Sequence, residues 1–122
     1  MTRKPVWLKR DDWAQAEDAW RGRVEGADLD TQITVFFFSS DEIGAGPVLH
    51  KHPYDEMFIV RAGRARFTVG DRKIDAEAGD ILMAPAEMAH KFESLGPGRL
   101  ETTDLHLSPR FVQTDLEGEN AG

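Results

Sequence analysis

Cysteine is absent from this sequence of 122 residues. Its absence excludes disulfides, thiolate metal ligands and cysteine nucleophiles, so that any metal must be bound by His, Asp or Glu. Long apolar runs are also missing, because the longest ones, residues 33–38 and 81–86, fall well below the ~20 residues of a membrane helix. No apolar signal-peptide core follows the basic N-terminus. We therefore expect a cytoplasmic protein without a membrane segment.

A basic surface for nucleic acid is lacking as well. The chain has 15 basic and 22 acidic residues, a formal net charge of -7. The small basic cluster near the N-terminus is followed at once by Asp11 and Asp12. We expect no nucleic-acid partner. The length is that of one domain.

The N-terminal region, residues 1–30, is expected to form a short helix or arm outside the main domain. Trp13, Ala16 and Trp20 recur at helical spacing, which predicts an amphipathic helix over residues 11–20. An extended arm is the alternative, because so short a segment is marginal as a helix. In either form, the tryptophans are expected to pack on the core or at a subunit interface.

Residues 31–108 have the texture of a small all-β domain. Short β-prone runs alternate with Gly, Pro and Asp turns, a pattern typical of a sandwich or barrel. Gly70 and Asp71 predict a hairpin turn, because Gly adopts positive φ without steric cost. The predicted strands are residues 32–39, 57–61, 64–69, 81–84, 90–94 and 100–107.

The C-terminal region, residues 109–122, is expected to be an arm that ends in a frayed tail. Phe111, Val112 and Leu116 would pack on the barrel or on a partner. The polar residues that follow them predict fraying.

Three histidines and one glutamate are the candidate metal ligands of the sequence. In a strand, His50 and His52 would point to the same face about 7 Å apart, and Glu56 could reach the same site after a turn. Closure of a barrel could bring His90 opposite them. Three neutral imidazoles and one carboxylate suit Fe, Mn, Co, Ni, Cu or Zn and leave positions open on an octahedral ion.

The spacing of these residues resembles the first signature motif of the cupin superfamily. Five residues separate Gly44 from His50, one residue separates the two histidines, three lead to Glu56, and six more lead to Gly63. The motif matches at every defining position.

A second block resembles the second cupin motif. Gly79 is followed after five residues by Pro85, and His90 lies at the distance that this motif prescribes. The sequence departs from it at two positions, with Glu87 where the motif has Gly and Ser94 where it has Asn. Neither position is a metal ligand in the family.

The resemblance implies a single-domain cupin, a double-stranded β-helix or jelly-roll barrel. It assigns one divalent transition metal (Fe, Mn, Ni, Co, Cu or Zn) to His50, His52, Glu56 and His90. Strand phase predicts Phe58, Val60 and Phe92 as the pocket lining, with ordinary core packing as the alternative. His106 is either a general acid or base beside the metal or a hydrogen-bonded strand residue.

The function that follows is metal-dependent catalysis on a small oxygen-bearing organic substrate. Dioxygenase chemistry is slightly favoured, with isomerase, decarboxylase and lyase chemistry also open. The alternative is a non-catalytic cupin that binds or senses a small molecule. A homodimer is expected, because it would cover the barrel edges and the hydrophobic N-terminal arm.

Overall fold

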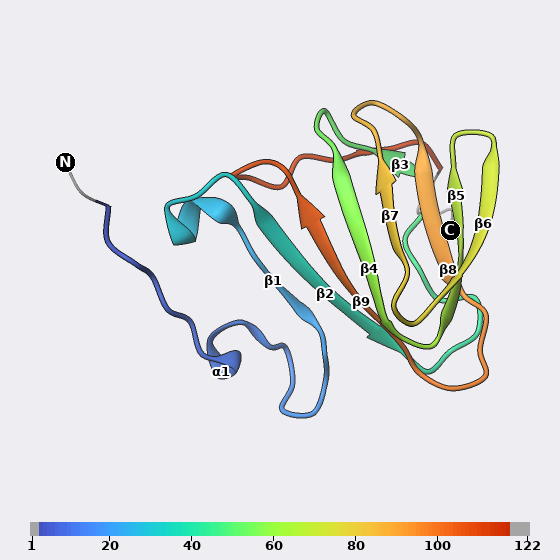
Figure 1. The fold of residues 1–122 in the computed structure, drawn as a ribbon, viewed down its shortest axis with the longest axis horizontal. Helices are drawn as coiled ribbons and strands as arrows, with labels where there is room; N and C mark the ends of the chain where they lie inside the picture. Colours follow the sequence, from blue (N-terminus) through green and yellow to red (C-terminus); the bar gives the residue numbers. More distant parts are fainter. Residues whose placement is uncertain (1–2, 118–122) are drawn as a thin grey trace.

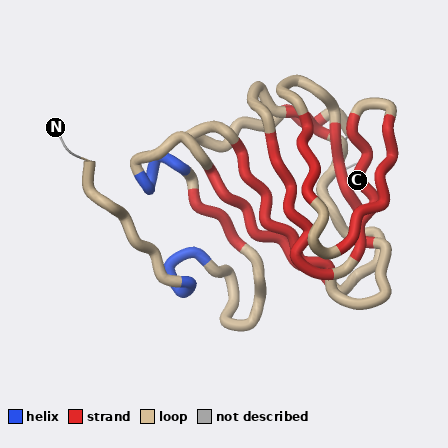
Figure 2. The backbone as a smooth tube through the Cα atoms, in the orientation of Figure 1, coloured by secondary structure: helices blue, strands red, loops and turns tan. Residues whose placement is uncertain are grey.

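Two five-stranded antiparallel sheets face each other in the computed structural model, which describes residues 3–117. Sheet A has the order β1-β2-β9-β4-β7 and sheet B the order β10-β3-β8-β5-β6 (Figures 1 and 2). The prediction of an all-β barrel is confirmed. The strands are β1 (Gly22–Val24), β2 (Thr34–Ser40), β3 (His50–Lys51), β4 (Glu56–Ala62), β5 (Arg64–Val69), β6 (Arg72–Glu77), β7 (Ile81–Ala84), β8 (His90–Ser94), β9 (Leu100–His106) and β10 (Thr114–Asp115).

Alternation along the strands separates the core from the surface. On β4, Phe58 and Val60 are each 1% exposed, whereas Ile59 between them is only half-buried. Phe67 on β5 packs between Phe58 and Phe92, with ring centroids 5.1 and 5.3 Å away. The two inner faces therefore meet in an aromatic core next to the inward-facing polar residues.

Three predicted strands, 64–69, 81–84 and 90–94, are confirmed with the same bounds, and three others are shifted by one or two residues at an end. The hairpin turn is also confirmed, since β5 and β6 pair around Gly70, which has a φ of 60°. The sequence analysis missed β1, β3, β6 and β10. Three of these have only two or three residues, and the charges of β6 obscure the inward alternation of Ile74 and Ala76.

A short N-terminal helix is confirmed, but it does not extend over residues 11–20 as predicted. Helix α1 covers only Arg10–Trp13, because Ala14 is extended and forms a β-bridge with Gly22. The returning chain stacks Trp13 on Phe37 of β2 with ring centroids 3.8 Å apart. Packing against sheet A thus outweighs local helical periodicity. The other helix is a 3₁₀ turn, η1 (Gly26–Leu29).

The turn before β8 keeps a backbone shape that normally favours glycine. Glu87 has a φ of 66°, in the left-handed region, and its N–H donates to the carbonyl of His52 at 2.7 Å. Glu87 stands where the cupin motif has Gly. The departure therefore changes the side chain and adds local strain, but it preserves the turn.

Residues 110–117, here called the C-terminal strap, lie against the barrel beside β3. Strand β10 pairs with β3, and Leu116 N–H donates to Leu49 O at 2.8 Å. Phe111 packs on Phe36 of β2, with ring centroids 4.9 Å apart. The frayed tail was predicted for residues that include 118–122, which lie outside the described part of the chain.

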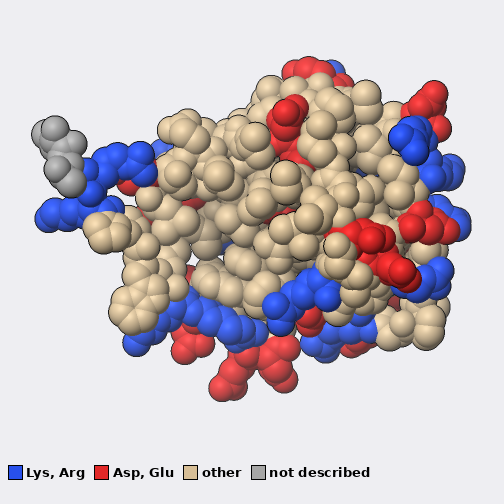
Figure 3. Space-filling model, in the orientation of Figure 1, with Lys and Arg blue, Asp and Glu red and all other residues tan. Residues whose placement is uncertain are grey.

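Charges are mixed on the surface. On the face seen in Figure 3, acidic and basic side chains are interspersed around the rim, and few charges lie at the centre. Within residues 3–117, no helix has the length and apolar character needed to span a membrane.

Candidate metal centre

Four buried side chains from both sheets converge at one end of the barrel. His50 on β3 lies opposite His90 on β8 in register, and Glu56 begins β4 in the other sheet. His52 follows β3, and its ring centroid is 4.8 Å from that of His50. One potential ligand atom from each of these four residues lies within 4.8 Å of the others. The structure thus brings together the four residues predicted as ligands.

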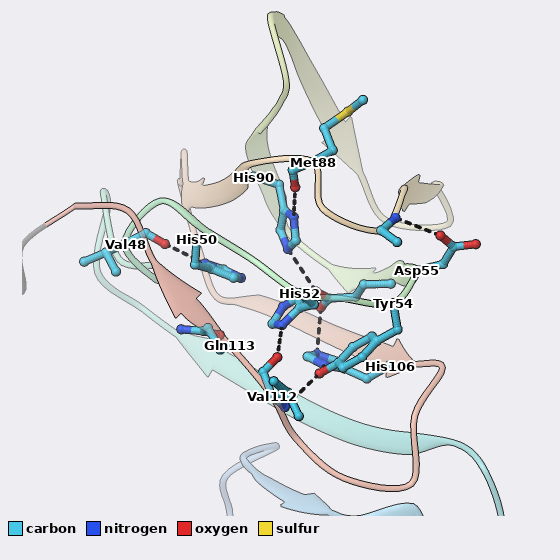
Figure 4. Close-up of polar contacts among 12 residues, drawn as sticks. Val48, His50, His52, Tyr54, Asp55, Met88, His90, His106, Val112 and Gln113 are labelled. Atoms are coloured by element: carbon cyan, nitrogen blue, oxygen red, sulfur yellow. Dashed lines mark hydrogen bonds and ion pairs between the residues drawn. The ribbon is translucent and has the colours of Figure 1, made fainter.

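Backbone carbonyls determine which nitrogen of each ring carries the proton. The Nδ1 atoms of His50, His52 and His90 lie 2.6, 2.8 and 3.0 Å from the carbonyl oxygens of Val48, Val112 and Met88 (Figure 4). A carbonyl only accepts hydrogen bonds, so each Nδ1 must donate. In the neutral rings, every Nε2 therefore has a free lone pair, which is the form that binds a metal.

Two of these lone pairs meet the carboxylate of Glu56. The Nε2 atoms of His52 and His90 are both 3.0 Å from Glu56 Oε1, and His52 Nε2 has no hydrogen-bond partner. When both rings are neutral, their Nε2 atoms and Glu56 Oε1 are all hydrogen-bond acceptors, so none of these contacts is a hydrogen bond and the atoms repel one another. A bound cation satisfies all of these atoms at once. The residues present therefore fit a divalent transition metal.

The protonation states of His50 and Glu56 near neutral pH favour metal binding. Burial lowers the pKa of His50 from 6.5 to about 4. Although burial alone would raise the pKa of Glu56, the hydrogen bond from His106 holds it well below its usual range. Near neutral pH, His50 is neutral and Glu56 is charged.

His106 lies beside Glu56 but faces it with a different atom. Val112 N–H donates to the Tyr54 hydroxyl at 3.3 Å, and that hydroxyl lies 2.7 Å from His106 Nδ1. Because the tyrosine oxygen already accepts from an amide, its own proton goes to Nδ1. The Nε2–H of neutral His106 then donates to Glu56 Oε2 at 3.0 Å. His106 thus occupies one carboxylate oxygen and leaves Oε1 directed at the rings of His52 and His90.

A cavity of about 510 Å³ opens above this centre. Its volume is in the usual range for small-molecule sites. Of the predicted lining residues, Phe58 and Phe92 border the cavity, while Val60 lies only in the core. His50, Glu56 and His106 also border the cavity, so that it reaches the histidine cluster.

Several residues of the site escaped the sequence analysis. Tyr54 reads as a turn residue in the sequence, and Asp104 as part of an ordinary strand. The signal for Asp104 was its position two residues before His106, which places both on the inner face. Arg23 and Phe111, which border the cavity from outside the motifs, gave no local signal.

The sequence and the fold both match known proteins. The family described as Cupin domain matches residues 38–106. An uncharacterized protein from Streptomyces coelicolor is 39% identical over 44 residues, which cover 36% of this chain and 42% of that protein. This chain therefore matches less than half the length of its curated relative.

Solved structures share the double-stranded β-helix. An oxalate decarboxylase from Bacillus subtilis, studied for its Mn(II) centres, superposes with a TM-score of 0.71 at 22% identity, covering 94% of this chain and 30% of that one. An uncharacterized Klebsiella pneumoniae protein with a double-stranded β-helix domain has a TM-score of 0.69 at 17% identity, covering 91% and 96%. Together with the family match, these structures confirm the predicted jelly-roll fold.

Acid should destabilise the metal-free protein before its carboxylates titrate. Folded His50 stays neutral down to a pH of about 4, whereas in the unfolded chain it takes up a proton near 6.5. Between these values the unfolded state binds more protons, so stability falls as the pH falls, by about 3 kcal/mol in total for this residue. Urea unfolding with a chelator at several pH values measures this loss. His50→Gln should show a shallower fall, and equal slopes would contradict the assignment.

Removing the Tyr54 hydroxyl should weaken metal binding without unfolding the barrel. Tyr54→Phe leaves His106 Nδ1 and Val112 N–H unpaired and lets Glu56 Oε2 turn. Partners of this kind are worth roughly 10- to 100-fold in metal affinity. Competition with a chromophoric chelator gives the affinity, and circular dichroism checks the fold. His106→Gln should show a comparable loss; two variants with wild-type affinity would refute the role of this hydrogen-bond chain.

Proposed function

Because the chain belongs to the cupin domain family, we propose that it is a metal-dependent enzyme acting on a small organic oxygen-bearing substrate. His50, His52, Glu56 and His90 would hold one divalent transition metal. The observation that carries the proposal is the meeting of unprotonated Nε2 atoms with Glu56 Oε1 in a buried cluster that borders a cavity.

The metal would supply Lewis acidity or, as iron or copper, activation of O₂. Four protein ligands leave two positions open on an octahedral ion. We propose dioxygenase chemistry as the first reaction to test. Decarboxylation comes next, because the similar solved structures include a protein named oxalate decarboxylase.

The protein's own side chains prepare the site for such a reaction. Phe58 and Phe92 make part of the cavity wall apolar, which favours an organic substrate over water. His106 fixes the orientation of Glu56 through its Nε2–H. It is also our candidate for proton transfer, since it borders the cavity itself.

Metal content tests the site. Tag-free wild type should contain close to one equivalent of one ion, measured by plasma mass spectrometry, and His50→Ala/His90→Ala should contain none. His52→Ala should lose most of its metal and stay folded, because the His52 ring packs on Tyr54 and Phe111 rather than on the aromatic core. Wild-type protein without metal, even after reconstitution, would contradict the proposal.

Turnover separates an enzyme from a binding module. O₂ consumption by the iron-loaded protein, and CO₂ release by the manganese-loaded protein, would be followed with diketones, catechols and hydroxy acids. We expect one class to be turned over by the wild type and not by the double variant. Tight binding of a small molecule without turnover under any metal would instead favour the sensor alternative.

We also propose that the chain forms a homodimer, in the cytoplasm, through the outer face of sheet A. Four apolar residues are cross-strand neighbours on this face and point away from the core: Val35, Leu105, Met57 and Met83. Met83 is 50% exposed and Ile81, on the same face of β7, is 63% exposed. A contiguous apolar sheet face of this kind marks an interface, and twofold packing of two copies is the commonest solution.

Charges on this face should separate the copies. Ile81→Glu/Met83→Glu replaces exposed side chains, so the fold should persist while light scattering reports a monomer. Ile43→Glu is the matched control, because Ile43 is 74% exposed but lies in the loop after β2, against Gly96, and not on a strand of sheet A. A wild-type monomer, or a double variant that stays dimeric, would contradict this interface.

A further inference from the structure

Asp104 is a buried carboxyl group that the proposed metal centre does not use. It lies on β9, is 5% exposed and borders the cavity. Its Oδ1 has no hydrogen-bond partner among the described residues. Burial, with the nearby charge of Glu56 adding to it, raises the pKa of Asp104 well above the usual value.

The surroundings of Asp104 compensate only part of the cost of burying it, because the Thr102 side chain on the same strand lowers the pKa of Asp104 less than burial raises it. Its register partners in sheet A are Phe36 on β2 and Phe58 on β4, whose side chains offer no hydrogen bond and also border the cavity. A buried polar atom without a partner destabilises a fold. Within residues 3–117, Asp104 is the only residue with such an orphan atom that borders the cavity. The Asp104 carboxyl is therefore a polar group of the cavity wall with an oxygen that no hydrogen bond among the described residues satisfies.

A cation without a protein partner lies elsewhere on the cavity wall. The guanidinium of Arg23 on β1 sits over the rings of Phe36 and Phe111, 5.6 and 5.1 Å from their centroids. No carboxylate of residues 3–117 pairs with it within 4 Å, and its side chain is exposed. Arg21 borders the same cavity, but it donates to Ser39 O at 2.6 Å. A guanidinium that packs against aromatic rings can still donate its N–H groups to a carboxylate.

We propose that Arg23 and Asp104 are the polar anchors of a site for a hydroxylated carboxylic acid with an apolar body. Arg23 pairs with the carboxylate, and the Asp104 carboxyl at the cavity wall forms a hydrogen bond with the hydroxyl. The phenylalanine side chains of the cavity contact the apolar body.

This substrate class rests on the proposed function, because it places the hydroxyl end of the ligand near the metal centre. Asp104 is the diagonal neighbour of Glu56 across β9 and β4, which corresponds to about 7 Å between Cβ atoms. The aromatic wall favours a ligand with an apolar body over a bare dicarboxylate. The free guanidinium favours an acid over an amine.

The test compares acids that differ by one hydroxyl, mandelate and phenylacetate, by calorimetry on the metal-loaded protein. Wild type should bind mandelate roughly tenfold more tightly, the usual size for a hydrogen bond to a buried carboxyl. Asp104→Leu should abolish the preference and leave the phenylacetate affinity unchanged. Arg23→Gln should weaken both acids several-fold by a similar factor, keep the preference for mandelate, and leave binding of benzyl alcohol unaffected.

One further variant and one further measurement guard against a folding defect. Asp104→Asn keeps an acceptor oxygen and should retain part of the preference. Without any ligand, Asp104→Leu should raise the unfolding midpoint by several degrees, because it removes a buried orphan carboxyl. A lower midpoint would show that Asp104 serves the fold and would overturn its assignment to a ligand.

Other outcomes overturn the proposal directly. The proposal fails if wild type binds the two acids equally or binds neither measurably. It also fails if Asp104→Leu keeps the preference for mandelate, or if Arg23→Gln binds both acids as tightly as wild type does. Metal content measured on the same samples keeps the two proposals apart. Wild type without metal refutes the metal centre, whereas the hydroxyl comparison on that sample still tests Asp104.

Discussion

Three hydrogen bonds from imidazole Nδ1 atoms to backbone carbonyls organise this molecule's functional end. Because Val48, Met88 and Val112 each offer only an acceptor, the neutral rings of His50, His90 and His52 turn the lone pair of Nε2 inward. The carboxylate of Glu56 lies among them. A cluster of acceptors in a buried place is unfavourable by itself and becomes favourable around a cation. The barrel thus holds these nitrogen and oxygen atoms in positions that suit a bound cation.

The fold supplies these contacts from distant parts of the chain. Sheet B brings His50 and His90 into register, sheet A contributes Glu56 and His106, and the C-terminal strap adds the carbonyl of Val112. Val112 also anchors the Tyr54 hydroxyl through its N–H. One residue of the strap therefore orients both a ligand ring and the carboxylate. Loss of the strap would disturb the site even though none of its residues is a candidate ligand.

The sequence predicted the barrel and the four converging ligands because their signals are local: period-two alternation, turn glycines and fixed spacing. It could not predict β10 or the short β1, because a strand of two or three residues forms only where a partner edge exists. Trp13 and Trp20 had helical spacing, yet contact with Phe37 decided their position. The partners of Tyr54, and the isolation of Asp104 between Phe36 and Phe58, depend on cross-strand neighbours that no local pattern reveals.

The most direct test of the central claim is the position of the ion in a crystal of the metal-loaded protein, found by anomalous scattering. The account predicts a single peak about 2.0–2.2 Å from Nε2 of His50, His52 and His90 and from one oxygen of Glu56. His106 should remain outside the coordination sphere, hydrogen-bonded to the second oxygen. A peak bound by His106, or by Nδ1 of any of the three rings, would contradict the account.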